Sequence, residues 1–216
     1  MSAVAVALEG KDVQHRYGAR VGLRAVSFNL TAPGVVAIRG ANGAGKSTLL
    51  RILAGLLRPS HGTTDFRVSG EAISPPSRPR WVGYAGPELA FYPEFSAAEN
   101  LQFAAETRGL ADPDASVRTA LERVGLQSRA SDQVAALSSG MLQRLALAFA
   151  LLHDPPVLLL DEPGSHLDEE GKAGFEDLVA RERGRRLVVI ATNEEREWSL
   201  AERWIELQGR GLGDPA

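Results

Sequence analysis

Short apolar runs bounded by turn residues recur along the chain. The clearest of these runs occupy residues 34–40, 79–86, 155–163 and 185–193. Runs of this kind are typical of strands that are buried on both faces of a parallel sheet. Between them, apolar side chains recur at helical spacing over 46–57 and 139–152, and less regularly over 169–183. The first 30 residues instead alternate apolar and polar side chains, which predicts an antiparallel sheet.

Strands that alternate with helices predict an α/β fold whose ligands bind at the carboxyl ends of the strands. The proline-rich segment 77–93 interrupts this alternation and introduces a mainly helical stretch at 97–126. We therefore expect one domain made of a mostly parallel α/β core with an N-terminal antiparallel layer and an inserted helical subdomain. The expected boundaries are 1–85 and 145–216 for the core, and 86–144 for the helical subdomain.

Composition narrows the possible functions. A chain of 216 residues with 44% hydrophobic residues can bury one sizeable core. The net charge of −3 gives no basic field, so we expect no nucleic-acid partner. The absence of cysteine excludes disulfides and thiolate metal sites. The most apolar run, residues 145–152, is far shorter than the roughly 20 residues that span a bilayer, so we expect no membrane span.

The sequence GANGAGKST at residues 40–48 carries the sharpest chemical signal. It follows an apolar run and opens a predicted helix, which is the context that the phosphate-binding P-loop pattern requires. Its glycines let backbone N–H groups converge on phosphate oxygens, Lys46 reaches the β- and γ-phosphates, and Ser47 holds Mg²⁺. The alternative is a glycine-rich turn without a ligand. The predicted nucleotide-binding residues of this loop are Gly40, Ala41, Asn42, Gly43, Ala44, Gly45, Lys46, Ser47 and Thr48.

Two adjacent acids end the apolar run at 155–163. Asp161 is predicted to bind Mg²⁺ directly or through water, and Glu162 to polarise the water that attacks the phosphate. An apolar run that simply ends in a polar turn is the alternative. The P-loop pattern in the same chain favours the catalytic interpretation.

The sequence LSSGMLQR at residues 137–144 distinguishes among P-loop proteins. With it, the chain resembles the nucleotide-binding subunit of an ABC (ATP-binding cassette) transporter over roughly residues 4–207. The family signature reads Leu-Ser-Gly-Gly-Gln, so Ser139 and Met141 depart from it. The resemblance implies that Ser138 and Gly140 face the γ-phosphate of ATP held by a second copy of the chain. A helix capped by a serine is the alternative for this motif taken alone.

Further positions match the family in order, and two do not. The resemblance places Tyr17 under the adenine ring and Asp168 of the sequence GSHLD in a loop that crosses to the partner subunit. Near Pro87 the family usually has a glutamine that senses Mg²⁺ and the membrane subunit, and this chain has no glutamine at that position. Asn193 stands where the family has a histidine that contacts the γ-phosphate. We expect the amide of Asn193 to donate to that phosphate, and ATP hydrolysis to be slow.

The resemblance implies a Mg-ATP-dependent homodimer that drives transmembrane permease subunits from the cytoplasmic face of the cell membrane. Within the family, residues 84–110 look most like the ATPase of the haem-handling cytochrome c maturation complex. A small exporter ATPase for drugs, lipids or peptides, a nucleotide-dependent clamp on DNA or ribosomes, and a weakly hydrolysing regulatory module are the alternatives. The clamp relatives usually carry a coiled-coil insertion or a second cassette, and this chain has neither. We expect the permease to dock beside residues 86–100, with Phe91, Tyr92 and Phe95 as its apolar contacts, unless these side chains pack the subdomain's own core.

Overall fold

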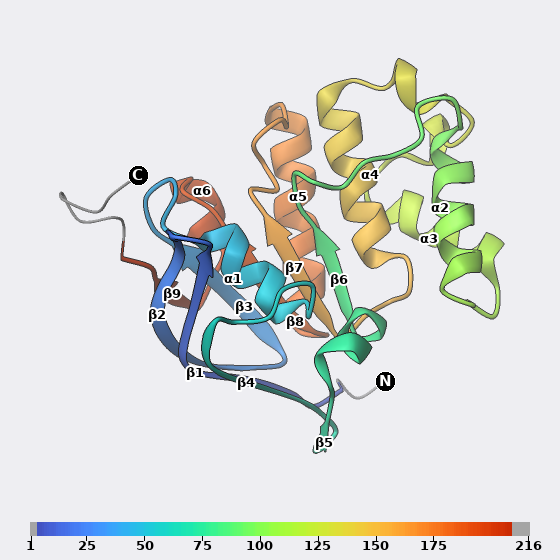
Figure 1. Ribbon diagram of the computed structural model, residues 1–216. Coiled ribbons are helices and arrows are strands. Elements are labelled where there is room, and N and C mark those ends of the chain that lie inside the picture. Colours follow the sequence, from blue (N-terminus) through green and yellow to red (C-terminus); the bar gives the residue numbers. More distant parts are fainter. Residues whose placement is uncertain (1–3, 209–216) are drawn as a thin grey trace.

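The computed structural model, which describes residues 4–208, contains two β-sheets (Figure 1). The first sheet is antiparallel, has four strands, and follows the order β2-β1-β4-β5. Its strands are β1 (Val6–Tyr17), β2 (Arg20–Thr31), β4 (His61–Val68) and β5 (Glu71–Ala72). The antiparallel pairing predicted for the first 30 residues is therefore confirmed, since β1 and β2 form a hairpin.

The second sheet is parallel and has five strands in the order β6-β7-β8-β3-β9. Its strands are β3 (Gly34–Arg39), β6 (Val82–Ala85), β7 (Val157–Asp161), β8 (Leu187–Ala191) and β9 (Arg203–Glu206). Every residue of β7 and β8 is buried, as continuous apolar runs predict. The strand β8 lies between β7 and β3, so the carboxyl ends of these three strands meet at one edge of the sheet.

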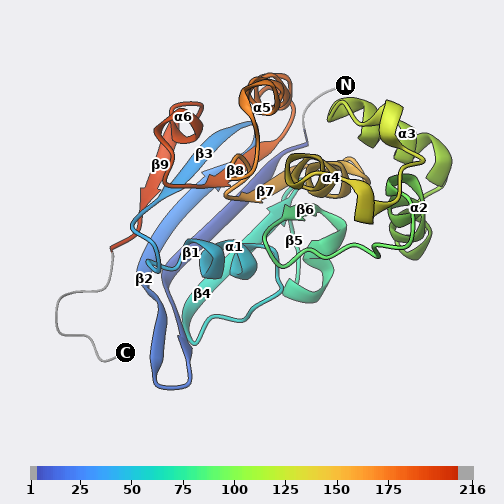
Figure 2. The ribbon, with the colours of Figure 1, turned by 90° about the horizontal axis from the view of Figure 1, so that it is seen from above.

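The helix α1 (Lys46–Leu53) lies between the two sheets, as Figure 2 shows. Its buried side chains, including Leu49, Leu50 and Leu53, join residues of both sheets in one hydrophobic cluster. The opposite face of the parallel sheet packs against α5 (Glu169–Glu182) and against one side of α4 (Ser139–Leu151). The sheet is thus covered on both faces, which fixes the position of the loops at its carboxyl edge.

Among the sequence-predicted elements that fall short of their expected bounds are one helix and one strand. The helix predicted over 46–57 ends at Leu53, because Gly55 adopts a left-handed backbone and Arg78 donates to the carbonyl oxygen of Ile52 at 2.9 Å. The strand predicted over 79–86 begins only at Val82. Residues Pro75–Arg80 form a 3₁₀ helix instead, since proline lacks the N–H that a central strand must donate.

The helices α2 (Ala97–Thr107) and α3 (Pro113–Arg123) form the predicted helical stretch and lie to one side of the parallel sheet (Figure 2). They pack with the other side of α4 around a separate hydrophobic cluster. Two short 3₁₀ turns, Gln127–Arg129 and Val134–Ala136, connect α3 to α4. Because α4 runs through the expected boundary at residues 144 and 145, it joins the helical subdomain to the core.

Candidate functional site

The loop between β3 and α1 is built for close backbone approach. Gly45 has a φ of 105°, a conformation that favours glycine, and a Cβ there would lie 2.5 Å from the carbonyl oxygen of Gly22. Lys46 is the first residue of α1, so the free N–H groups of the first helical turn point out of the same loop. A helix start of this kind favours a bound anion such as a phosphate.

Lys46 is buried, and its ammonium group joins two loops that are distant in sequence. It donates to the carbonyl oxygen of Gly40 and to the side-chain oxygen of Asn193, each at 3.0 Å. The amide nitrogen of Asn193 in turn donates to the side-chain oxygen of Asn42. Asn193 thus lies at the P-loop, as expected, with its amide oxygen turned toward Lys46.

Asp161 ends β7 beside the P-loop and is 4% exposed. Neither of its carboxylate oxygens has a hydrogen-bond partner among the described residues. Burial raises the pKa of Asp161, while the neighbouring Ser47 hydroxyl counters that rise. The buried Asp161 carboxylate and the neighbouring Ser47 hydroxyl are both oxygen ligands, which suit a hard cation such as Mg²⁺.

Glu162 follows at the strand's end and has a left-handed backbone, with a φ of 49°. Its N–H donates to the carbonyl oxygen of Ala191 at 2.8 Å, which joins the ends of β7 and β8. Its side chain lines a cavity of about 240 Å³ together with the P-loop residues Gly43, Lys46 and Ser47. The predicted catalytic acid therefore faces the predicted phosphate site.

Tyr17 lines another wall of this cavity and is 43% exposed. Its hydroxyl lies 3.5 Å from the Thr48 hydroxyl, and its ring covers Gly22. The ring packs edge-on against His15, with centroids 4.5 Å apart. An exposed ring held at the rim of a phosphate site is placed to stack on a base.

Ser138 and Gly140 do not line the cavity of the P-loop in this single chain. Ser138 caps α4 by accepting from the N–H of Met141 at 3.2 Å. Gly140 lies against the loop that carries Asp168, because a Cβ on it would be 3.1 Å from the carbonyl oxygen of His166. Asp168 caps α5 through the N–H of Gly171 at 2.8 Å. These three residues therefore lie outside the nucleotide cavity formed by the described residues of this chain.

The aromatic residues in the segment after β6 differ in how far they are buried. Phe91 is partly buried and packs on Phe149, with ring centroids 6.2 Å apart, so it serves the subdomain's own core. Tyr92 and Phe95 are more than half exposed and form an edge-to-face cluster with Phe103 of α2. The exposure of Phe103 has no signal in the sequence, because a single aromatic residue on a helix can be either buried or exposed.

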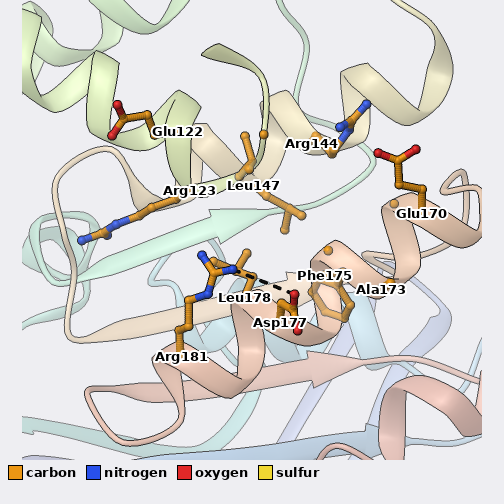
Figure 3. A pocket seen from close by; sticks show the side chains of 14 residues that line it. Glu122, Arg123, Arg144, Leu147, Glu170, Ala173, Phe175, Asp177, Leu178 and Arg181 are labelled. Carbon is orange, nitrogen blue, oxygen red and sulfur yellow. Dashed lines mark ion pairs between the residues drawn. The ribbon is translucent and has the colours of Figure 1, made fainter. Parts of the chain in front are cut away.

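A larger cavity, of about 430 Å³, lies between α5, α4 and the end of α3 (Figure 3). Its floor includes Leu147, Phe175 and Leu178, and charged side chains line its mouth. The ion pair between Arg181 and Asp177, at 3.9 Å, lies along one wall. None of the predicted site residues lines this cavity, so volume alone does not identify the chemical site.

Two charged residues of the site carry no signal in the sequence. Arg51 of α1 lines the P-loop cavity and pairs with Glu88, near the position where the glutamine is missing. Glu197 is 5% exposed, and it accepts from the N–H of Gly164 in the loop that follows Glu162. Each of these contacts joins segments far apart in sequence, which periodicity does not reveal.

Known proteins are similar to this chain in sequence and in fold. The profile of the family described as ABC transporter matches residues 23–165. The chain is 34% identical to the cytochrome c biogenesis ATP-binding export protein CcmA of Cupriavidus pinatubonensis, over 88% of this chain and 85% of that protein. It is 39% identical to the lipoprotein-releasing system ATP-binding protein LolD of Oleidesulfovibrio alaskensis, over 83% and 81% respectively. The dimeric post-hydrolysis structure of the ATP-binding cassette MJ0796, bound to ADP and Pi, superposes with a TM-score of 0.82 at 24% identity, over 93% of this chain and 94% of that one.

Proposed function

This chain belongs to the ABC transporter family and is an ATPase of that family, and we propose that it binds Mg-ATP between two copies to drive a membrane permease. The observation that carries the proposal is the convergence of Lys46, Ser47 and Glu162 on one cavity, with the buried carboxylate of Asp161 next to Ser47 at the carboxyl end of β7. Phosphate release from ATP by the purified chain, dependent on Mg²⁺ and lost in Lys46→Ala, is the test of the hydrolytic part.

The proposed chemistry assigns a separate task to each group. Lys46 and the N–H groups at the start of α1 bind the β- and γ-phosphates and offset their charge. Ser47 and Asp161 hold Mg²⁺, which neutralises phosphate charge when it is bound. Glu162 orients a water and accepts its proton as the water attacks the γ-phosphorus, and ADP leaves in line with that attack. Asn193 donates from its amide nitrogen to the γ-phosphate.

The position of Ser138 supports the homodimer. Ser138 and Gly140 carry the signature motif, yet they do not line the P-loop cavity of their own chain. In a dimer with twofold symmetry, the signature motif of each copy faces the nucleotide of the other copy. The same surface patch of each copy then forms the interface. ATP thereby holds two copies together, and its hydrolysis releases them.

The proposed membrane partner rests on membership of the ABC transporter family. Within residues 4–208 no helix is long and apolar enough to cross a bilayer. From the family membership we assign the transmembrane path to separate permease subunits and place this chain against the cytoplasmic face of the cell membrane. The exposed cluster of Tyr92, Phe95 and Phe103 is the apolar surface that receives a permease helix.

Replacing Tyr92 with glutamate tests this docking surface. The change puts a charge at the centre of an apolar contact, so we expect at least a tenfold weaker association with membranes that contain the permease. ATP affinity should stay unchanged, because Tyr92 does not line the nucleotide cavity. Sedimentation with membrane vesicles from the native cell, and nucleotide titration, measure the two quantities. Tyr92→Phe is the matched control and should bind as the wild type does. Loss of membrane and nucleotide binding together would show misfolding and contradict the assignment.

The finer proposal is that the permease belongs to a haem-exporting cytochrome c maturation complex. Its support is the similarity to the cytochrome c biogenesis relative over most of both chains, together with the missing glutamine after β6. Deletion of the gene should then remove covalently bound haem from c-type cytochromes, measured by haem staining.

A small exporter of another substrate is the second candidate, favoured by the similar identity to the lipoprotein-releasing relative. Intact c-type cytochromes in the deletion strain would select it. A weakly hydrolysing regulatory module remains the alternative if the purified chain binds ATP but releases no phosphate.

A further inference from the structure

A buried carboxylate of the short helix after β8 contacts the loop that follows β7. Glu197 belongs to the short helix α6 (Glu195–Trp198), which begins two residues after Asn193. Its Oε1 accepts from the N–H of Gly164 at 2.9 Å, in a hydrogen bond buried from solvent. Gly164 lies two residues after Glu162 and four before Asp168. Glu197 therefore contacts the loop that carries both the proposed catalytic acid and the segment proposed to face the second copy.

Gly164 and the side chain of Glu197 are closely packed. A Cβ on Gly164 would overlap with Oε1 of Glu197, so a larger residue at this position would displace the Glu197 side chain. The other oxygen, Oε2, is buried without a hydrogen-bond partner in the described part of the chain. A buried polar group without a partner costs free energy, so the fold retains this carboxylate at a cost.

We propose that Glu197 is a positioning residue for ATP hydrolysis, which fixes the side chain of Glu162 by holding the N–H of Gly164. The inference rests on the proposed role of Glu162. The turn after Glu162 is short, since the N–H of Ser165 donates to the carbonyl oxygen of Glu162 at 3.2 Å. A shift of the backbone at Gly164 therefore moves Glu162 as well. The φ of Glu162, 49°, lies in the small left-handed region, which leaves its backbone little room to adjust. Displacing a catalytic group by about 1 Å costs on the order of 10²-fold in rate.

The test compares kcat, ATP affinity and the melting temperature for variants of the full-length chain. Glu197→Ala removes the acceptor, and we expect kcat to fall by about 10- to 100-fold with ATP affinity within about twofold of the wild type. Glu197→Gln keeps an acceptor oxygen and should retain most of the activity. Glu195→Gln, on an exposed glutamate of the same helix, is the matched control and should change nothing.

A second background separates positioning from general stability. If Glu197 acts through Glu162, then adding Glu197→Ala to a Glu162→Gln chain should lower the residual rate by less than about threefold. An equal loss in both backgrounds, or a folded Glu197→Ala chain with wild-type kcat, would overturn the proposal. If Glu197→Ala does not fold, Gly164→Ala keeps the carboxylate and displaces it, and should give the same loss of kcat. A wild-type chain that releases no phosphate would instead refute the proposed function itself.

Discussion

Glu162→Gln is expected to arrest hydrolysis and to leave an ATP-bound dimer. Glutamine keeps the shape of the side chain but cannot accept the proton of the attacking water, so kcat should fall by at least about 10²-fold. ATP remains between the two copies because Lys46, Ser47 and Asp161 are untouched. Size-exclusion chromatography with ATP and Mg²⁺ should then show a dimer, which reverts to a monomer without nucleotide.

The matched control for this variant is Glu170→Gln, the same substitution at an exposed glutamate of α5. It should hydrolyse ATP as the wild type does and should not accumulate as a dimer. A Glu162→Gln chain that elutes only as a monomer, with ATP shown to be bound, counts against the nucleotide sandwich.

Asn193→His is expected to raise kcat by about tenfold with ATP affinity nearly unchanged. An asparagine amide offers a neutral donor, whereas an imidazole can become cationic near neutral pH. A charge-assisted hydrogen bond is roughly twice as strong as a neutral one, which corresponds to about tenfold in rate if it forms only in the transition state. Steady-state phosphate release and nucleotide titration measure the two effects.

Two hydrogen bonds hold the side chain of Asn193 in the present site. The amide oxygen of Asn193 accepts from Lys46, and its nitrogen donates to Asn42. A histidine cannot keep both contacts, and an imidazolium would stand close to the Lys46 ammonium. Asn193→Ala, which removes both contacts, should lower kcat. An unchanged or lower kcat in a folded Asn193→His chain would mean that the site is rebuilt around asparagine.

The sequence was sufficient where the chemistry is local. Residues 40–48 form one loop and the first turn of one helix, so their spacing alone predicts a phosphate site. The strands β3, β7 and β8 follow for a similar reason, since each is a short run that is apolar up to its last residue or throughout. The capping serine at 138 also follows from neighbouring residues, because its partner is only three positions away.

Contacts between distant segments could not be predicted in the same way. Asn193 meets Asn42 and Lys46 because β8 pairs with β3, and strand order is not encoded in hydrophobic periodicity. The early end of α1 depends on Arg78, which reaches back from a segment 26 residues away. Phe91 and Tyr92 are adjacent and equally aromatic, yet only the packing of Phe149 decides which of them is covered.

The most direct test of the central claim mixes two inactive variants. Lys46→Ala disables the P-loop of one copy, and Ser138→Asp keeps the helix cap of the other while placing a negative charge against the γ-phosphate. If each site combines one copy's P-loop with the other's signature motif, a mixed dimer contains one intact site. We predict that the mixture releases phosphate well above the sum of the separate variants. A mixture no more active than that sum, with both variants folded, would contradict the account.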